Sequence, residues 1–296
     1  MNHSRKNVAK CVSTWCKAAV VVAVGFCSVT ASASDSRQDT DRAEYLMGVF
    51  PYLAPRELEK MYAPIAADLS NAIERDVMFM TSSTYETFMG NLDKQMYDIV
   101  FVQPFDYVTI ADKYGYRPLA TRNKPLPAIL VVKPDSRFNS IADLRGKTIA
   151  LPPSVAAISY LIKDHLKKSG VDPDTDVVIE HHRSHASCMH NVLLGTADAC
   201  GTAPPALRFF ENKMNTPLRT IATTEGIPNS IFAVHPRVPE ELQKKLIQQI
   251  TSWSVSEEGR NLLKGVKVEA FIAAEDREYD TVRSMARKYR YPRPAP

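Results

Sequence analysis

The sequence predicts an α/β fold built from two lobes, each with its own mostly parallel sheet. Short apolar segments alternate with amphipathic helical segments along most of the chain, which is the pattern of strand–helix–strand units. After the second such unit, an extended segment near residue 230 can lead the chain back to the first, so that the chain crosses between the lobes twice. With 296 residues, of which 45% are hydrophobic, the chain can bury a large core.

The first unit begins with an extended apolar segment over residues 44–50. Pro64 then predicts the first turn of a helix, where its missing N–H costs nothing, and Ile65 and Leu69 follow on one face. The run Ile-Val-Phe-Val within residues 98–102 predicts a buried strand. The other elements expected in this unit are a strand over 77–80 and a helix over 85–92.

The second unit starts near Ala128. Pro153 leads into a helix whose core face carries Ile158 and Ile162, and Gly170 is expected to end it, because glycine readily adopts the left-handed conformation of a helix C-terminus. The remaining elements expected here are strands over 128–132, 148–151, 177–179 and 197–200, and helices over 141–147, 185–194 and 205–211.

The chain is then expected to return to the first lobe and finish with helices. Residues 230–235 are extended, and helical patterns follow over 239–253, 257–264 and 276–289. Two crossings between lobes are what a hinge requires. The predicted boundaries are 44–127 with 231–291 for lobe 1, 128–230 for lobe 2, and hinge crossings near 128 and 230.

The N-terminal 33 residues have the features of a secretory signal peptide. Basic residues precede an apolar run over 18–29, and Ala31-Ser32-Ala33 supplies the small residues of a cleavage site. The apolar run is shorter than the roughly 20 residues of a transmembrane helix. We therefore expect cleavage after the segment 1–33, a mature chain without a membrane span, and a periplasmic location.

The positive net charge of the chain comes entirely from that N-terminal segment. Removing its four cations, Arg5, Lys6, Lys10 and Lys17, from 37 basic residues leaves 33 against 33 acidic residues. A neutral mature protein has no basic field for nucleic acid or an anionic membrane surface. Two cysteines remain beyond the segment, Cys188 and Cys200, so the mature chain is no disulfide scaffold, and the two are either free or paired.

Several short segments recur in the same order in a known family. They are Gly48-Val49-Phe50-Pro51, the run 61–66, Asp98-Ile99-Val100, the run 141–147, Ser184-His185, Val192 and Ala197-Asp198-Ala199. Over about residues 44–275 the chain resembles the phosphate-, phosphite- and phosphonate-binding proteins of ABC transporters. The resemblance implies a type II periplasmic binding protein that acts as a monomer without a cofactor. It would capture a small oxyanion and deliver it to a membrane permease.

The resemblance also implies a ligand site. It places Ser154 and the backbone amides of Val155 and Ala156 at a helix N-terminus, where unpaired N–H groups favour an anion. Tyr85 and His185 match a tyrosine and a histidine that hydrogen-bond the ligand in the family. Each has a plainer interpretation: Ser154 as an N-cap, Tyr85 as a packing residue and His185 as a helix-start residue satisfied by backbone.

Gln103 is a further candidate ligand-binding residue because of its position. It follows a parallel strand at the end where open α/β sheets bind ligands. Otherwise it is a surface amide that closes a turn.

The sequence departs from the family pattern at the proposed anion site. The family commonly has Ser-Thr-Ser from position 154, so Val155 and Ala156 remove two hydroxyls and leave the anion to backbone amides. Pro205 and Asn229 stand where aminophosphonate binders have carboxylates, which disfavours a ligand ammonium.

The alternatives concern the histidine-rich run over residues 180–190. His181 and His182 would point to opposite sides of a strand end, so we expect no metal site. Cys188, one turn after His185, is an alternative thiol ligand for arsenite or a related metalloid oxyanion, presented to a membrane histidine kinase rather than a permease. A buried structural cysteine is the competing interpretation.

The sequence motifs do not indicate catalysis. The chain has no nucleophile elbow and no Walker loop, so we expect that it is not an enzyme.

Overall fold

The computed structural model describes residues 44–291. The predicted signal peptide, residues 1–33, lies outside the described residues. Within 44–291 no helix is both long and apolar enough to cross a membrane.

A first sheet has the strand order β11-β4-β10-β3-β1-β2. In this sheet β1, β2 and β3 are parallel, and β10 runs antiparallel to both β3 and β4. Strands β1 to β4 therefore all end at one edge, which we call the carboxyl edge. The strands are β1 (Glu44–Val49), β2 (Asp76–Met80), β3 (Ile99–Val102), β4 (Arg117–Arg122), β10 (Ile231–Val234) and β11 (Phe271–Ala273).

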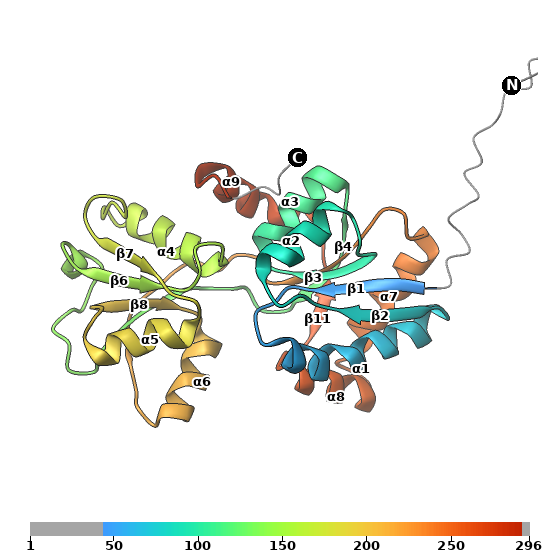
Figure 1. Cartoon of the computed structure of the whole chain (residues 1–296), viewed down its shortest axis with the longest axis horizontal. Helices are drawn as coiled ribbons and strands as arrows, with labels where there is room; N and C mark the ends of the chain where they lie inside the picture. Colours follow the sequence, from blue (N-terminus) through green and yellow to red (C-terminus); the bar gives the residue numbers. More distant parts are fainter. Residues whose placement is uncertain (1–43, 292–296) are drawn as a thin grey trace, which may run out of the picture. The chain divides into compact units, whose positions relative to one another are not determined.

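Helices cover both faces of this sheet (Figure 1). One face packs against α2 (Tyr85–Asp93), α3 (Pro104–Tyr114) and α9 (Asp280–Lys288), the last preceded by a 3₁₀ turn, Asp276–Tyr279. The other face packs against α1 (Pro55–Ile73), α7 (Glu240–Ser252) and α8 (Glu257–Gly265). Alternate residues of β3 divide between these cores: Val100 and Val102 face α2 and α3, whereas Ile99 and Phe101 face α1.

The first helix starts earlier than the sequence predicts. It begins at Pro55, which occupies its first turn, and Pro64 lies inside it. An interior proline forfeits one helical hydrogen bond. Pro64 is on the exposed face, where water can satisfy the freed carbonyl, while Leu58 and Tyr62 extend the buried face toward Pro55. The prediction of a helix opened by Pro64 is wrong for this reason.

A second sheet has the order β7-β6-β8-β5-β9, with β6, β7 and β8 parallel. Helix α4 covers one face, and α5 and α6 cover the other (Figure 1). The strands are β5 (Ile129–Val132), β6 (Thr148–Leu151), β7 (Val178–His181), β8 (Ala199–Thr202) and β9 (Arg219–Thr223). The helices are a 3₁₀ turn (Ala142–Leu144), α4 (Ala157–Lys168), α5 (His185–Leu194) and α6 (Pro204–Met214).

The two segments that join the sheets run beside each other. Leu126 and Ile227 exchange backbone hydrogen bonds of 2.8 and 3.1 Å, and the Asn229 amide donates to the Lys124 carbonyl at 3.0 Å. Asn229 is therefore engaged in connecting these segments. The predicted lobe boundaries and the hinge remain predictions.

Candidate functional site

The side chain of Gln103 connects the two sheets at the carboxyl edge. Gln103 follows β3 as the N-cap of α3, but its side chain does not cap that helix. Its Oε1 instead accepts from the Ala157 backbone N–H at 3.0 Å, and its Nε2 donates to the Val155 carbonyl at 2.9 Å. One buried amide thus links the end of β3 to the turn that precedes α4.

Tyr85, Asp106 and Tyr291 form a group beside Gln103 in which Asp106 and Tyr291 are buried and Tyr85 is partly buried. We call this group the acidic cluster. Both tyrosine hydroxyls donate to the Asp106 Oδ1, that of Tyr291 at 2.6 Å, and they lie 2.8 Å from each other. The Gln103 Nε2 lies 3.2 Å from the Tyr85 hydroxyl and 3.1 Å from that of Tyr291. The hydroxyl that the resemblance assigns to a ligand is therefore engaged by a carboxylate.

Asp106 is fully buried, and its second oxygen, Oδ2, has no hydrogen-bond partner within the described residues. Burial raises the pKa of Asp106 to about 6, and the bonds from Tyr291, Tyr85 and Gln103 oppose that rise. A negative charge placed next to this group would be repelled by it. The acidic cluster suits a ligand group that donates a hydrogen bond better than one that only accepts.

The turn before α4 differs from the prediction at Ser154. The helix starts at Ala157 with Ala156 as its N-cap, and Ser154 is exposed in a turn closed by the bond from the Ala156 N–H to the Pro153 carbonyl at 2.8 Å. Ser154 is therefore not the N-cap, because this turn postpones the first helical residue. Val155 contributes its carbonyl, which accepts from Gln103 and, at 3.3 Å, from Tyr291.

His185 is the first residue of α5, as predicted. Ser184 caps this helix in a reciprocal pair with Ser187, and the His185 Nδ1 lies 2.9 Å from the hydroxyl of Thr202, the buried last residue of β8. Burial lowers the pKa of His185 to about 4, so the imidazole is neutral at neutral pH. Its hydrogen bonds in the structure do not reach Tyr85, Gln103 or Val155.

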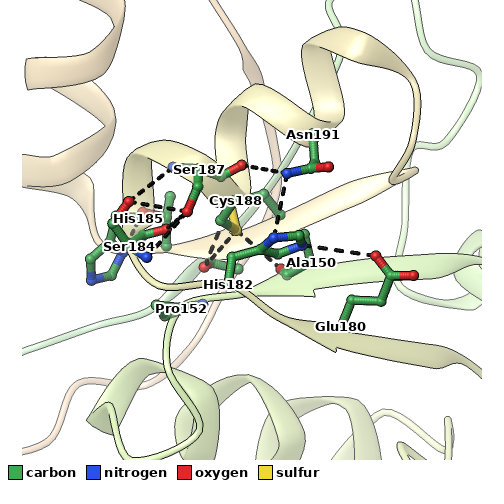
Figure 2. The surroundings of a disulfide bond; sticks show 12 residues. Ala150, Pro152, Glu180, His182, Ser184, His185, Ser187, Cys188 and Asn191 are labelled. Atoms are coloured by element: carbon green, nitrogen blue, oxygen red, sulfur yellow. Dashed lines mark hydrogen bonds and ion pairs between the residues drawn. A yellow bond between two sulfur atoms is a disulfide. The ribbon is translucent and has the colours of Figure 1, made fainter.

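Cys188 is fully buried and forms a disulfide with Cys200 of β8. Figure 2 shows Cys188 under α5, close to Ala150 of β6, with the Ser184–Ser187 pair at the start of the helix. The open question of pairing is thereby answered in this structure, and Cys188 offers no free thiol to a metalloid. The nearby histidines have other partners: His181 Nδ1 lies 2.9 Å from the Pro152 carbonyl, and His182 lies beside Glu180 at 3.8 Å.

A protein-family model described as "ABC transporter, phosphonate, periplasmic substrate-binding protein" matches residues 47–279. No curated protein sequence matches the chain.

Solved structures of binding proteins share the fold. PhnD1 of Prochlorococcus marinus, in complex with methylphosphonate, superposes with a TM-score of 0.72 at 16% identity, over 84% of this chain and 99% of that one. A binding-protein component of an ABC phosphonate transporter from Pseudomonas aeruginosa gives 0.68 at 16% identity, over 83% and 86%. The alkanesulfonate-binding protein SsuA of Xanthomonas axonopodis pv. citri, bound to MOPS, gives 0.56 at 15% identity, over 85% and 94%. The predicted type II fold is confirmed.

Proposed function

Because the chain belongs to the family of periplasmic substrate-binding proteins of phosphonate ABC transporters, we propose that it captures a phosphonate, phosphite or phosphate ion and delivers it to the permease. Members of this family are substrate-binding proteins and not enzymes, as the sequence predicts. We further propose that residues 1–33 direct export and are removed, and that the mature protein acts as a monomer.

The single observation that carries this proposal is the Gln103 link between the two sheets. Open α/β sheets bind ligands beyond the carboxyl ends of their strands. Gln103 follows β3 of one sheet, and its partners Val155 and Ala157 follow β6 of the other. The proposed ligand site therefore includes Tyr85, Gln103, the turn 154–156 and His185, with entry of the ligand replacing part of this internal bonding.

The nature of the ligand is proposed from the groups near that link. Methylphosphonate, bound by the Prochlorococcus protein, and an alkanesulfonate, the ligand class of the Xanthomonas protein, both carry an oxyanion. A phosphonate or phosphite that keeps one proton can donate to Asp106, whereas a sulfonate at neutral pH has no proton to donate. The acidic cluster therefore favours the phosphorus oxyanions.

Thermal unfolding and calorimetry with methylphosphonate, phosphite, phosphate, methanesulfonate and arsenite test the proposal. A ligand at about 100 times its dissociation constant should stabilise the protein by roughly 2.7 kcal/mol. We expect that stabilisation from at least one phosphorus oxyanion, and less from methanesulfonate. Binding of arsenite alone, after reduction of the Cys188–Cys200 bond, would instead support a metalloid sensor that signals to a histidine kinase.

Closure of the two predicted lobes is part of the same proposal. Its support is that the connecting segments are paired at Leu126 and Ile227 and can bend together. Small-angle scattering should show a smaller radius of gyration with the bound oxyanion. An unchanged radius at saturation would contradict a hinge near 128 and 230.

A further inference from the structure

Arg122 is a partly buried cation at the carboxyl edge of the first sheet. It is the last residue of β4 and its backbone N–H donates to the Ser230 carbonyl at 3.3 Å. Its Nε is buried and has no hydrogen-bond partner among the described residues. Among the ion pairs within 4.0 Å formed by residues 44–291, none involves Arg122.

Two tyrosines and a phenylalanine surround this guanidinium. Its Cζ lies 5.4 Å from the centre of the Phe101 ring. The hydroxyls of Tyr52 and Tyr62 lie 3.0 Å apart. The Tyr62 ring lies 5.4 Å from the Phe101 ring on which the guanidinium packs, and the Tyr52 ring lies 6.4 Å from that of Tyr62. Burial raises the pKa of both hydroxyls, and the positive charge of Arg122 and its hydrogen bonding to them oppose that rise. We call Arg122, Tyr52 and Tyr62 the basic cluster.

Two other partly buried arginines are paired with acids, and a third, Arg219, has its donors taken by Asn139 and two backbone carbonyls. Arg237 bonds Asp98 at 2.6 Å, and Arg283 bonds Asp112 at 2.8 Å. Burying a charge without a counter-charge is unfavourable, and an aromatic face compensates for it only in part. Arg122 keeps its buried Nε–H for a further acceptor, and a guanidinium can bind carboxylate and phosphate oxygens in a bidentate manner.

We propose that Arg122, Tyr52 and Tyr62 form an oxyanion subsite that supplies the positive charge absent from the acidic cluster. This inference rests on the proposed function, because it concerns the same class of ligand. Tyr52 is 37% exposed, whereas Tyr62 is fully buried and its hydroxyl fixes the position of the Tyr52 hydroxyl. The Arg122 guanidinium and the Tyr52 hydroxyl can donate to oxygens of one tetrahedral anion, while Tyr62 holds the Tyr52 hydroxyl in place.

The test compares Arg122→Gln with Arg117→Gln, a substitution at the exposed first residue of the same strand. Calorimetry with methylphosphonate, phosphite, phosphate and sulfate measures the dissociation constants. We expect Arg122→Gln to weaken the anions that the wild type binds by at least about tenfold, the usual effect of a hydrogen bond to a charged group. Arg117→Gln should leave them within about twofold.

A measurement without any anion separates binding from a structural role. Removing an unpaired buried charge should leave the unfolding midpoint of Arg122→Gln equal to or above that of the wild type. A clearly lower midpoint would mean that the guanidinium stabilises the fold, and would overturn the subsite. If Arg122→Gln does not fold at all, the subsite is equally overturned.

Tyr52→Phe gives a second, milder variant, because this side chain is partly exposed and loses only its hydroxyl. We expect it to weaken the same anions by about threefold to tenfold. Anion binding that both variants leave unchanged would refute the subsite and leave the proposed function intact. A wild type that binds none of the four anions would refute both.

Discussion

The acidic and basic clusters lie at the same edge of one sheet. They are built alike but around side chains of opposite charge. In each, two tyrosine hydroxyls approach one charged side chain: Asp106 on the side of α2 and α3, Arg122 on the side of α1. The Asp106 Oδ1 accepts from both tyrosine hydroxyls, which lie within hydrogen-bonding distance of the Gln103 amide. Each cluster also keeps one buried atom without a hydrogen-bond partner among the described residues, the acceptor Asp106 Oδ2 in one and the donor Arg122 Nε in the other. The difference teaches that the kind of atom left unsatisfied decides what each cluster can bind: the carboxylate oxygen can take a further donor, and the guanidinium N–H can take a further acceptor.

The largest effect is expected at Asp106. Its folded-state pKa of about 6 lies above the ordinary 3.8, so the folded protein binds this proton more tightly than the unfolded chain. The free energy of unfolding therefore falls as the pH rises from about 4 to about 6, by roughly 3 kcal/mol for this one group. Asp106→Asn should abolish that fall.

Chemical denaturation of Asp106→Asn at a series of pH values measures this effect. The exposed Asp135→Asn serves as the matched control and should follow the wild type throughout. A difference between wild type and Asp106→Asn that does not change from pH 4 to pH 7 would show that the carboxylate is not held in an unfavourable charged state.

His185→Gln is the next test, because the contribution of His185 to the free energy of unfolding changes with pH in the opposite direction to that of Asp106. The folded-state pKa of about 4 is below the ordinary 6.5, so the unfolded chain binds this proton more tightly. Stability from His185 is complete above about pH 6.5 and is lost as the pH falls toward 4, by less than about 3 kcal/mol because the residue is partly exposed. In the wild type the two contributions partly cancel between about pH 4 and pH 6. In His185→Gln the free energy of unfolding should therefore fall more steeply as the pH rises through this range. An unaltered pH profile would contradict a buried neutral imidazole.

Removing one hydroxyl from each cluster compares them directly. Tyr291→Phe deletes bonds to Asp106, Gln103 and Val155, and should lower the free energy of unfolding by about 2 kcal/mol, since one of them goes to a charged group. Tyr62→Phe deletes the contact to Tyr52 and should cost about 1 kcal/mol or less. Equal losses in thermal or denaturant unfolding would contradict the stronger hydrogen bonding assigned to the tyrosines of the acidic cluster.

The smallest effect is expected at Ser154. This residue is exposed and caps no helix, so Ser154→Ala should change the free energy of unfolding by less than about 0.5 kcal/mol. Oxyanion affinity should fall only if the hydroxyl contacts the ligand directly, by a factor of about ten or less. A loss of stability near 1 kcal/mol would restore its interpretation as a helix cap.

Elements with a clear local signal were predicted well from the sequence. The helix predicted over residues 185–194 is α5 (His185–Leu194), and the Ile-Val-Phe-Val run predicted as a buried strand is β3. Strand β4, with the sequence Arg-Pro-Leu-Ala-Thr-Arg, has no comparable apolar run, and β11 has only three residues, so both went unpredicted. Arg122 was missed with β4.

The site was predicted only in part, since its contacts join distant segments. Gln103 was identified from its place after a strand, but Asp106 lies in α3, a helix that was not anticipated. The contact between Tyr291 and Asp106 spans 185 positions, which no local pattern indicates. The start of α4 depends on the turn over residues 153–156. Two adjacent prolines followed by a serine do not specify the geometry of that turn, so the sequence could not predict where the helix begins.

The disulfide between Cys188 and Cys200 has a consequence for handling the protein. It joins α5 to β8, the same two elements that hold His185 against Thr202, and closes a loop with a sequence separation of 12. Such a bond is worth about 3 kcal/mol. Material made in a reducing cytoplasm, or stored with a thiol reagent, will lack this crosslink and hold His185 less firmly. Ligand screens on oxidised and reduced samples are therefore measurements on two different proteins.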